Sequence, residues 1–236
     1  LDALGQVNRI VAVSGIDYVS NPYILAHKDS IKDMGPEMNY ELLLGLKPDI
    51  VLLYGIGDAQ TAITDKLKEL SIPYIYMGEY LEESPLGKAE WMVVLSELTD
   101  SREKGIEIFS EIPKRYLSLK ALTESVGQCP TVMFNMPWND SWVMPSTKSY
   151  MAQLVADAGA EYIYKENSSN SSTPIGLETA YGLIQKADYW INVGSATSLD
   201  ELKTVNPKFA DAKAVRERTV YNNNLRLTPT GGNDYW

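Results

Sequence analysis

Residues 38–55 read MNYELLLGLKPDIVLLYG, and residues 176–194 repeat the same design as GLETAYGLIQKADYWINVG. Each stretch begins as a short amphipathic helix with a carboxylate in its first turn, Glu41 in one and Glu178 in the other. A lysine and an aspartate then lead into an apolar strand, which ends at a glycine six residues after the aspartate. The repeat predicts two similar α/β lobes, and a cleft between two such lobes is a natural place for a ligand.

Short β-branched runs that end in glycine or in polar loops alternate with helical patterns along the chain. These runs predict strands at 9–13, 49–54, 73–77, 131–135, 188–193 and 219–222. Helices are expected between them, at 39–46, 58–70, 86–98, 101–125, 147–158, 177–186 and 209–216. This alternation predicts parallel sheets that are covered by helices on both faces.

The longest predicted helix, 101–125, begins at a good N-cap candidate, Ser101, and keeps one apolar face at three-to-four spacing. A helix of about 25 residues is roughly 38 Å long, which is enough to link two lobes. We therefore predict an α/β protein of two Rossmann-like lobes with parallel sheets, joined by one long α-helix. The expected boundaries are 1–100 for the N-terminal lobe, 101–127 for the linking helix and 128–236 for the C-terminal lobe.

Both ends of the sequence are unusual for a domain. LDALG reads as the last turn of a helix that closes on Gly5, and the chain stops at GGNDYW. We expect the N-terminal lobe to be truncated at its start and the C-terminal lobe at its end.

Composition excludes several classes of function. The net charge is −10 and there is no Lys/Arg run, so nucleic acid and anionic membranes are poor partners. The one cysteine, Cys129, excludes a disulfide framework and a thiolate cluster, and we expect it to be a buried structural thiol. The one histidine, His27, cannot build a two-His or three-His metal site, and no GxSxG elbow supports its use in a catalytic triad. No metal site and no catalytic residue are predicted.

Aromatic residues gather where predicted strands end, which is where open α/β sheets bind ligands. The candidate ligand contacts are Tyr18, Tyr54, Tyr80, Trp138 and Trp142, with Trp236 near the C-terminus. Rigid aromatic faces suit a large, flat or partly apolar ligand, although such rings can equally cap the hydrophobic core. Arg226, in the loop after the last strand, is a candidate partner for an anionic ligand group or simply a solvated charge.

Three segments resemble a known family. MGPEMNYELLLGLKPDIVLLYG (34–55), SYMAQLVADAGAEYIY (149–164) and AVRERTVYNNN (214–224) are similar to segments of class III periplasmic substrate-binding proteins of ABC importers. This is the family of the vitamin B12-, ferric siderophore- and haem-binding proteins. The resemblance covers nearly the whole chain, but the family's opening strand with its Ser-Pro loop and its closing helix have no counterpart here.

The resemblance implies two lobes joined by one long helix, with little hinge closure. It also implies that one glutamate on each lobe docks onto arginines of the membrane permease, and Glu41 and Glu178 occupy the matching positions. The local alternative is that each carboxylate only complements a helix N-terminus, which is worth about 0.3 to 1 kcal/mol. Both roles are compatible.

The resemblance therefore implies a monomeric, non-enzymatic solute-binding protein that carries a metal chelate to an ABC permease and its ATPase. The chelate could be a ferric siderophore, haem or cobalamin, whereas the single histidine argues against a bare divalent metal. No cofactor is expected. The expected location is periplasmic, or lipid-anchored on the outer face of the cytoplasmic or outer membrane. The alternatives are a sensor or receptor module of the same fold, or a two-lobed α/β enzyme, although no GxGxxG or P-loop motif supports the enzyme.

Overall fold

The chain divides into two compact units in a computed structural model that describes residues 1–55, 60–225 and 227. Among the described residues, unit 1 comprises Leu1–Leu81 and Trp91–Gly105 with Leu227. Unit 2 comprises Glu82–Glu90 and residues 106–225. Within the described parts of both units, no helix is long and apolar enough to cross a membrane.

Unit 1 contains two pairs of parallel strands. Strand β1 (Ala12–Val13) pairs with β2 (Lys32–Asp33), and β3 (Val51–Tyr54) pairs with β4 (Tyr74–Met77). The register places Tyr54 opposite Met77, so β3 and β4 end side by side. The residues that follow these two strands are therefore brought to one edge of the sheet.

Helices complete unit 1. The α-helices are α1 (Pro22–Ala26), α2 (Tyr40–Leu46), α3 (Gln60–Glu69) and α4 (Pro85–Leu98), of which α4 starts in unit 2. The 3-10 helices are η1 (Val7–Arg9), η2 (Ile16–Tyr18) and η3 (Glu79–Leu81). Helix α2 begins where the Asn39 side chain accepts a hydrogen bond from the Leu42 amide at 3.0 Å. It ends at Lys47, which adopts a left-handed conformation before Pro48. Leu43, Leu53 and Leu67 then bury the inner faces of α2, β3 and α3.

Unit 2 is built on a four-stranded parallel sheet in the order β11-β10-β5-β8. Its strands are β5 (Thr131–Phe134), β8 (Glu161–Tyr162), β10 (Tyr189–Ile191) and β11 (Val220–Tyr221). A second sheet is antiparallel, with the order β6-β7-β9. Its strands are β6 (Pro137–Trp138), β7 (Ser141–Met144) and β9 (Thr173–Gly176).

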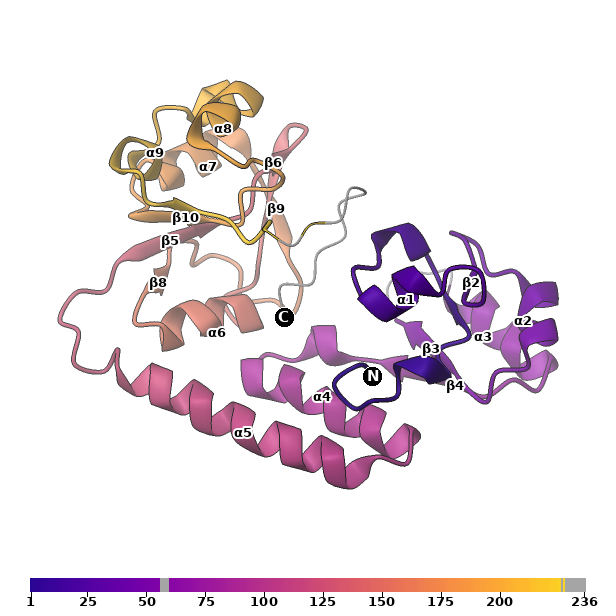
Figure 1. Cartoon of the computed structure of the whole chain (residues 1–236). Helices are drawn as coiled ribbons and strands as arrows, with labels where there is room; N and C mark the ends of the chain where they lie inside the picture. Colours follow the sequence, from indigo (N-terminus) through magenta and orange to yellow (C-terminus); the bar gives the residue numbers. More distant parts are fainter. Residues whose placement is uncertain (56–59, 226, 228–236) are drawn as a thin grey trace. The chain divides into compact units, whose positions relative to one another are not determined.

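Helices lie on both sides of the parallel sheet of unit 2. Figure 1 shows α7, α8 and α9 on one side and α6 on the other. The helices are α6 (Tyr150–Asp157), α7 (Leu177–Ile184), α8 (Leu199–Val205), the 3-10 helix η4 (Pro207–Phe209) and α9 (Lys213–Glu217). The core between them contains Phe134, Trp142 and Trp190, which are fully buried, and Phe209 packs edge-on against Trp142 at 5.2 Å between ring centroids.

Helix α5 (Arg102–Ala121) is the longest helix of the described chain, and the chain passes from unit 1 to unit 2 within it. At its start, Gly105 approaches the fully buried Ser96 of α4 so closely that a Cβ on Gly105 would lie 2.2 Å from Ser96 Oγ. On the side of unit 2, the Tyr116 hydroxyl donates to Asp157 at 2.7 Å, and Lys120 pairs with the same carboxylate. These contacts attach α5 to the C-terminal end of α6.

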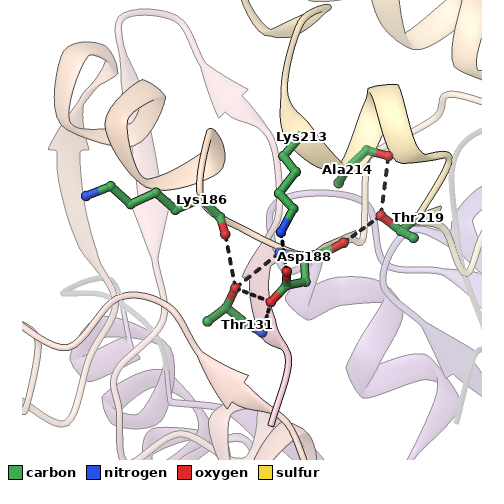
Figure 2. Close-up of polar contacts among 6 residues, drawn as sticks. All are labelled: Thr131, Lys186, Asp188, Lys213, Ala214 and Thr219. Carbon is green, nitrogen blue, oxygen red and sulfur yellow. Dashed lines mark hydrogen bonds and ion pairs between the residues drawn. The ribbon is translucent and has the colours of Figure 1, made fainter. Parts of the chain in front are cut away.

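A polar cluster joins the amino ends of the central strands in unit 2 (Figure 2). The Asp188 carboxylate, just before β10, accepts hydrogen bonds from the Thr131 amide at 2.7 Å and the Thr131 hydroxyl at 2.8 Å. Lys213 of α9 pairs with its other oxygen at 2.5 Å. The Thr219 hydroxyl, before β11, donates to the Asp188 carbonyl oxygen. One aspartate thus ties β5, β10, β11 and α9 together.

The predicted α/β class with parallel sheets is confirmed, and most predicted elements exist with shorter bounds. The structure differs from the sequence-based expectation in the antiparallel sheet and in β2, β8, α1 and α8, which were not predicted. The helix expected at 209–216 is instead η4 followed by α9, because Ala210 and Asp211 form a turn between them. Residues 136–145, expected to be a loop, form the β6–β7 hairpin, in which Asn139 takes the left-handed conformation of a tight turn.

Candidate functional site

The carboxyl ends of β3 and β4 carry a stacked pair of tyrosines. Tyr54 is the last residue of β3, and Tyr80 lies in η3, just after β4. Their ring centroids are 5.2 Å apart with an interplanar angle of 20°, and Tyr54 remains 50% exposed. Gly55 leaves room for this arrangement, because a Cβ there would lie 3.0 Å from the Tyr80 hydroxyl oxygen. The two tyrosines therefore form one aromatic surface, which can stack against a ligand.

A glutamate that the sequence reasoning missed lies beside this pair. Glu79 is the residue before Tyr80, and its Oε1 accepts a hydrogen bond from the Tyr54 hydroxyl. Its other carboxylate oxygen, Oε2, is buried and has no hydrogen-bond partner within the described part of the chain. The sequence contains a signal for it, because Glu79 comes two residues after the end of the strand predicted at 73–77.

Tyr18 lies after β1, in η2, and is 64% exposed. Asp33, the last residue of β2, stabilises the turn that precedes Tyr18, because its side chain accepts a hydrogen bond from the Gly15 amide at 2.9 Å. Gly15 has a φ of 71°, and a Cβ on it would lie 3.1 Å from the Tyr18 ring. The pKa of Asp33 is lowered, first by the hydrogen bond from the Gly35 amide and further by those from Gly15 and Ile16. Asp33 is thus a positioning residue for Tyr18.

Asparagines follow three of the four parallel strands of unit 2, at Asn135 after β5, Asn192 after β10 and Asn222 after β11. Asn135 and Asn192 both have a left-handed backbone, which asparagine tolerates better than most residues, and their side chains join through a 2.7 Å hydrogen bond. The Asn222 amide donates to the carbonyl oxygens of Gly194 and Ala196. These bonds fix the carboxyl edge of the sheet, and only NNN at 222–224 hinted at them in the sequence.

The two tryptophans of the β6–β7 hairpin lie in different environments. Trp138 is 75% exposed next to the hairpin turn, where it is available to a ligand. Trp142 is 0% exposed, and its Nε1 donates to the Phe134 carbonyl oxygen at 2.8 Å. Trp142 was predicted to contact a ligand at a strand end, but it belongs to the core of unit 2 because it points inward along β7. A ring without exposed surface offers nothing to a ligand in this conformation.

The two other ligand candidates, Arg226 and Trp236, lie outside the described residues. The two docking candidates lie in corresponding places, because Glu41 and Glu178 are both exposed in the first turns of α2 and α7. Within residues 1–55 and 60–225, no hydrogen bond or ion pair joins either carboxylate to another group. Their charge therefore remains available at the surface.

The lone cysteine and histidine contribute no recognisable chemistry. Cys129 is exposed, so the expectation of a buried thiol was wrong: it precedes Pro130 and β5 rather than lying within the strand. The His27 ring stacks on Tyr23 at 4.0 Å, and its Nδ1 lies 2.8 Å from the Tyr23 carbonyl oxygen. Where the structure describes side chains, no group of three or more His, Cys, Asp or Glu residues could hold a metal ion.

One hollow of about 460 Å³ lies at the opposite edge of the unit 2 sheet. Cys129, Asp188 and Thr219, which line it, all precede strands of the parallel sheet. Ligands of open α/β sheets bind beyond the carboxyl ends of the strands, and Asp188 here already has Thr131 and Lys213 as partners. Within each unit taken by itself, we therefore favour the carboxyl edge of the sheet as the place of a candidate site.

The chain is similar to known proteins over most of its length. Residues 1–224 match the family described as periplasmic binding protein. An uncharacterized lipoprotein of Methanocaldococcus jannaschii is 27% identical over 201 residues, which are 84% of this chain and 46% of that protein. A second uncharacterized lipoprotein of the same organism is 26% identical over 192 residues, covering 78% of this chain and 48% of that protein. The chain thus spans about half the length of these relatives.

Solved structures share the fold at low sequence identity. The periplasmic haem-binding protein of Vibrio cholerae has a TM-score of 0.74 at 16% identity, covering 99% of this chain and 88% of that one. The periplasmic vitamin B12-binding protein of Vibrio cholerae has a TM-score of 0.69 at 16% identity, with coverages of 98% and 86%. A possible iron-binding, periplasmic solute-binding protein of Staphylococcus epidermidis has a TM-score of 0.71 at 16% identity, with coverages of 94% and 84%. Because the family match extends over residues 1–224, and these structures show the same fold, this chain belongs to the periplasmic binding protein family.

Proposed function

We propose that this chain is an extracytoplasmic solute-binding protein that captures a metal chelate and delivers it to the permease of an ABC importer. The observation that carries the proposal is the set of exposed aromatic rings at strand ends, formed by Tyr18, Tyr54 and Trp138, in a chain of the periplasmic binding protein family. Stacking on such rings suits a large ligand with flat or apolar faces, and rigid rings lose little entropy on binding. Binding needs no chemical change in the ligand.

The proposed ligand is a ferric siderophore, haem or cobalamin. Similar structures come from proteins described as binding haem, vitamin B12 or iron, which supports this range without selecting within it. Titration of the purified protein with haemin, cyanocobalamin and a set of ferric siderophores, read by tryptophan fluorescence, tests the proposal. We expect saturable quenching by one class, and binding at least about tenfold weaker in Trp138→Ala, because a lost stacking contact of this size costs about 1.4 kcal/mol.

Leu119→Ala is the matched control for that titration. Leu119 is 64% exposed on α5 and lies outside the candidate site, so its loss removes apolar surface without touching the strand ends. An equal loss of affinity in both variants, or the absence of quenching by every chelate, contradicts the proposed ligand class.

Delivery is proposed to use Glu41 and Glu178 as contacts to permease arginines. This role is supported by the corresponding positions of the two residues, which are exposed carboxylates in the first turns of α2 and α7. In vesicles that contain the reconstituted permease and ATPase, Glu41→Ala and Glu178→Ala should lower ligand-stimulated ATP hydrolysis at least about fivefold, the loss of roughly 1 kcal/mol of docking energy at each site. Ligand affinity should not change.

Glu103→Ala is the control for docking, because Glu103 is an exposed carboxylate in the first turn of α5 and has the same relation to a helix N-terminus. If Glu103→Ala lowers ATP hydrolysis as much as the other two, the effect comes from general charge rather than from docking. If all three variants bind ligand and stimulate hydrolysis normally, Glu41 and Glu178 are not the docking contacts. If the unsubstituted protein binds ligand but does not stimulate hydrolysis, the sensor or receptor role of the same fold becomes the better account.

We further propose a monomer, located in the periplasm or held by a lipid anchor on the outer face of a membrane. Support for the anchor comes from the description of two relatives as lipoproteins. The assignment of 1–100 and 128–236 to two lobes, with 101–127 as the linker, stays a prediction. Membrane fractionation of the natural host, with and without detergent, tests the location.

A further inference from the structure

Only one of the two carboxylate oxygens of Glu79 has a hydrogen-bond partner within the described part of the chain. Its Oε1 accepts from the Tyr54 hydroxyl, whereas Oε2 is buried without a hydrogen-bond partner in the described part of the chain. Buried acceptors in native proteins are almost always paired, and an orphaned carboxylate oxygen is costlier than a neutral one. An unpaired oxygen of this kind indicates that a bound molecule supplies the missing hydrogen-bond donor.

The position of Glu79 indicates what that donor belongs to. Glu79 begins η3 directly after β4, at the carboxyl edge where the Tyr54 and Tyr80 rings are stacked. An aromatic surface and a hydrogen-bond acceptor side by side are the two elements by which a pocket holds and orients a partly apolar ligand. Glu79 therefore lies at the same edge of the sheet as the stacked tyrosines of the candidate site.

The charge of this edge restricts the ligand. Within the described ranges 1–55 and 60–225, no lysine or arginine forms an ion pair with Glu79. A ligand that presents only carboxylates to this edge would face an acceptor without gaining a donor, and like charges would repel. A ligand with an ammonium or amide N–H group would satisfy Oε2 instead.

We infer that Glu79 selects a ligand whose edge over the Tyr54–Tyr80 pair carries an N–H donor, an ammonium or a carboxamide, and that it disfavours an edge of carboxylates. This rests on the proposed function, because it names the ligand chemistry of the same site. It also disagrees with the interpretation of Arg226 in the sequence as a partner for an anionic ligand group.

Three small probes with one ring and different polar groups test the inference without knowledge of the natural ligand. Benzylammonium, benzamide and benzoate are titrated into the isotopically labelled protein, and the ring signals of Tyr54 and Tyr80 are followed by NMR. We expect the first two to shift these signals with affinities at least tenfold above that of benzoate. Equal affinities of benzoate and benzylammonium overturn the inference, and this comparison needs no variant.

Glu79→Gln then separates charge from the hydrogen bond. It keeps the shape and one acceptor, so benzylammonium should bind at least tenfold more weakly and benzamide only about threefold more weakly. Glu83→Gln removes the same charge at an exposed position four residues later and should change neither affinity. A Glu79→Gln protein that is folded by its NMR spectrum and binds all three probes as before overturns the inference.

Larger probes distinguish this result from failure of the proposed function. Ferrioxamine B carries an ammonium group, cyanocobalamin carries carboxamides, and haemin presents carboxylates. If the small probes show selectivity for N–H donors but no chelate binds, the inference about Glu79 stands and the proposed chelate ligand is contradicted. Tight haemin binding that is unchanged in Glu79→Gln supports a chelate carrier and overturns the role of Glu79.

Discussion

At the scale of single residues, carboxylates organise both units by accepting several hydrogen bonds at once. The Asp33 carboxylate holds the turn before Tyr18, and the Asp188 carboxylate joins the amino ends of β5 and β10 in unit 2. In each case the carboxylate lies at a strand terminus, where backbone amides would otherwise have no partner. These two aspartates give testable consequences because their pKa values depend on the contacts.

Asp188 makes the stability of unit 2 depend on pH. Lys213, the strongest cause, and the Thr131 amide and hydroxyl lower its pKa from 3.8 to about 2. A carboxyl whose folded pKa is depressed stabilises the fold above its unfolded pKa and loses this contribution as pH falls through the folded value. Because the side chain is partly exposed, we expect Asp188→Asn to cost about 1 kcal/mol at pH 7. The difference from the natural protein should shrink between about pH 4 and pH 2.

Urea denaturation across this pH range measures the effect. Asp200→Asn is the control, because Asp200 is 97% exposed and pairs only weakly with Lys203 at 3.5 Å. If Asp188→Asn lowers the free energy of unfolding by the same amount at every pH, the loss comes from the hydrogen bonds of Asp188 and not from its charge.

Asp33→Ala should loosen the turn before Tyr18. The Gly15 and Gly35 amides would lose their acceptor, which lies 2.9 Å from each. We expect their hydrogen exchange to accelerate about tenfold, in line with roughly 1.4 kcal/mol for hydrogen bonds to a charged group. Asp17→Asn, which removes an exposed charge in η2 that pairs with Lys28, should leave these two amides protected.

At the scale of elements, close packing fixes the start of α5 against α4. A Cβ on Gly105 would lie 2.2 Å from Ser96 Oγ and 2.4 Å from Ser96 Cβ, and Ser96 is fully buried. Gly105→Ala should therefore lower the free energy of unfolding by about 1–3 kcal/mol, although alanine is the better helix former.

Gly182→Ala in α7 is the matched helical control, because a Cβ there has nothing within 4 Å. It should be neutral or stabilising by up to about 1 kcal/mol. Equal thermal stability of the two alanine variants would contradict the close approach of α4 and α5.

At the scale of the whole molecule, the two units keep separate hydrophobic cores. Leu67 belongs to a core of unit 1 with Leu43 and Leu53, whereas Ile184 belongs to the core of unit 2 with Trp142 and Trp190. Leu67→Ala and Ile184→Ala should each cost about 2–5 kcal/mol. We expect faster hydrogen exchange only in the unit that carries each change. Acceleration throughout the chain in either variant would show that the units unfold together.

Local sequence signals determined much of this protein. The helix-to-strand stretches 38–55 and 176–194 gave α2–β3 and α7–β10, because periodicity, caps and glycine stops act within a few residues. They also placed Glu41 and Glu178 in first turns and Tyr54 at a strand end, and the strand predicted at 73–77 placed Tyr80 after its own end. The same signals failed for the β6–β7 hairpin, where proline, asparagine and aspartate in PWND read as a loop.

Only the tertiary structure decided which candidates can meet a ligand. Trp138 and Trp142 are four residues apart and alike in sequence, yet one is exposed and the other is buried against Trp190 and Phe209. Glu79 accepts a hydrogen bond from Tyr54 only because β3 and β4 end side by side. Burial and pairing depend on residues far apart in the chain, so periodicity reveals the elements but not the partners that each side chain finds.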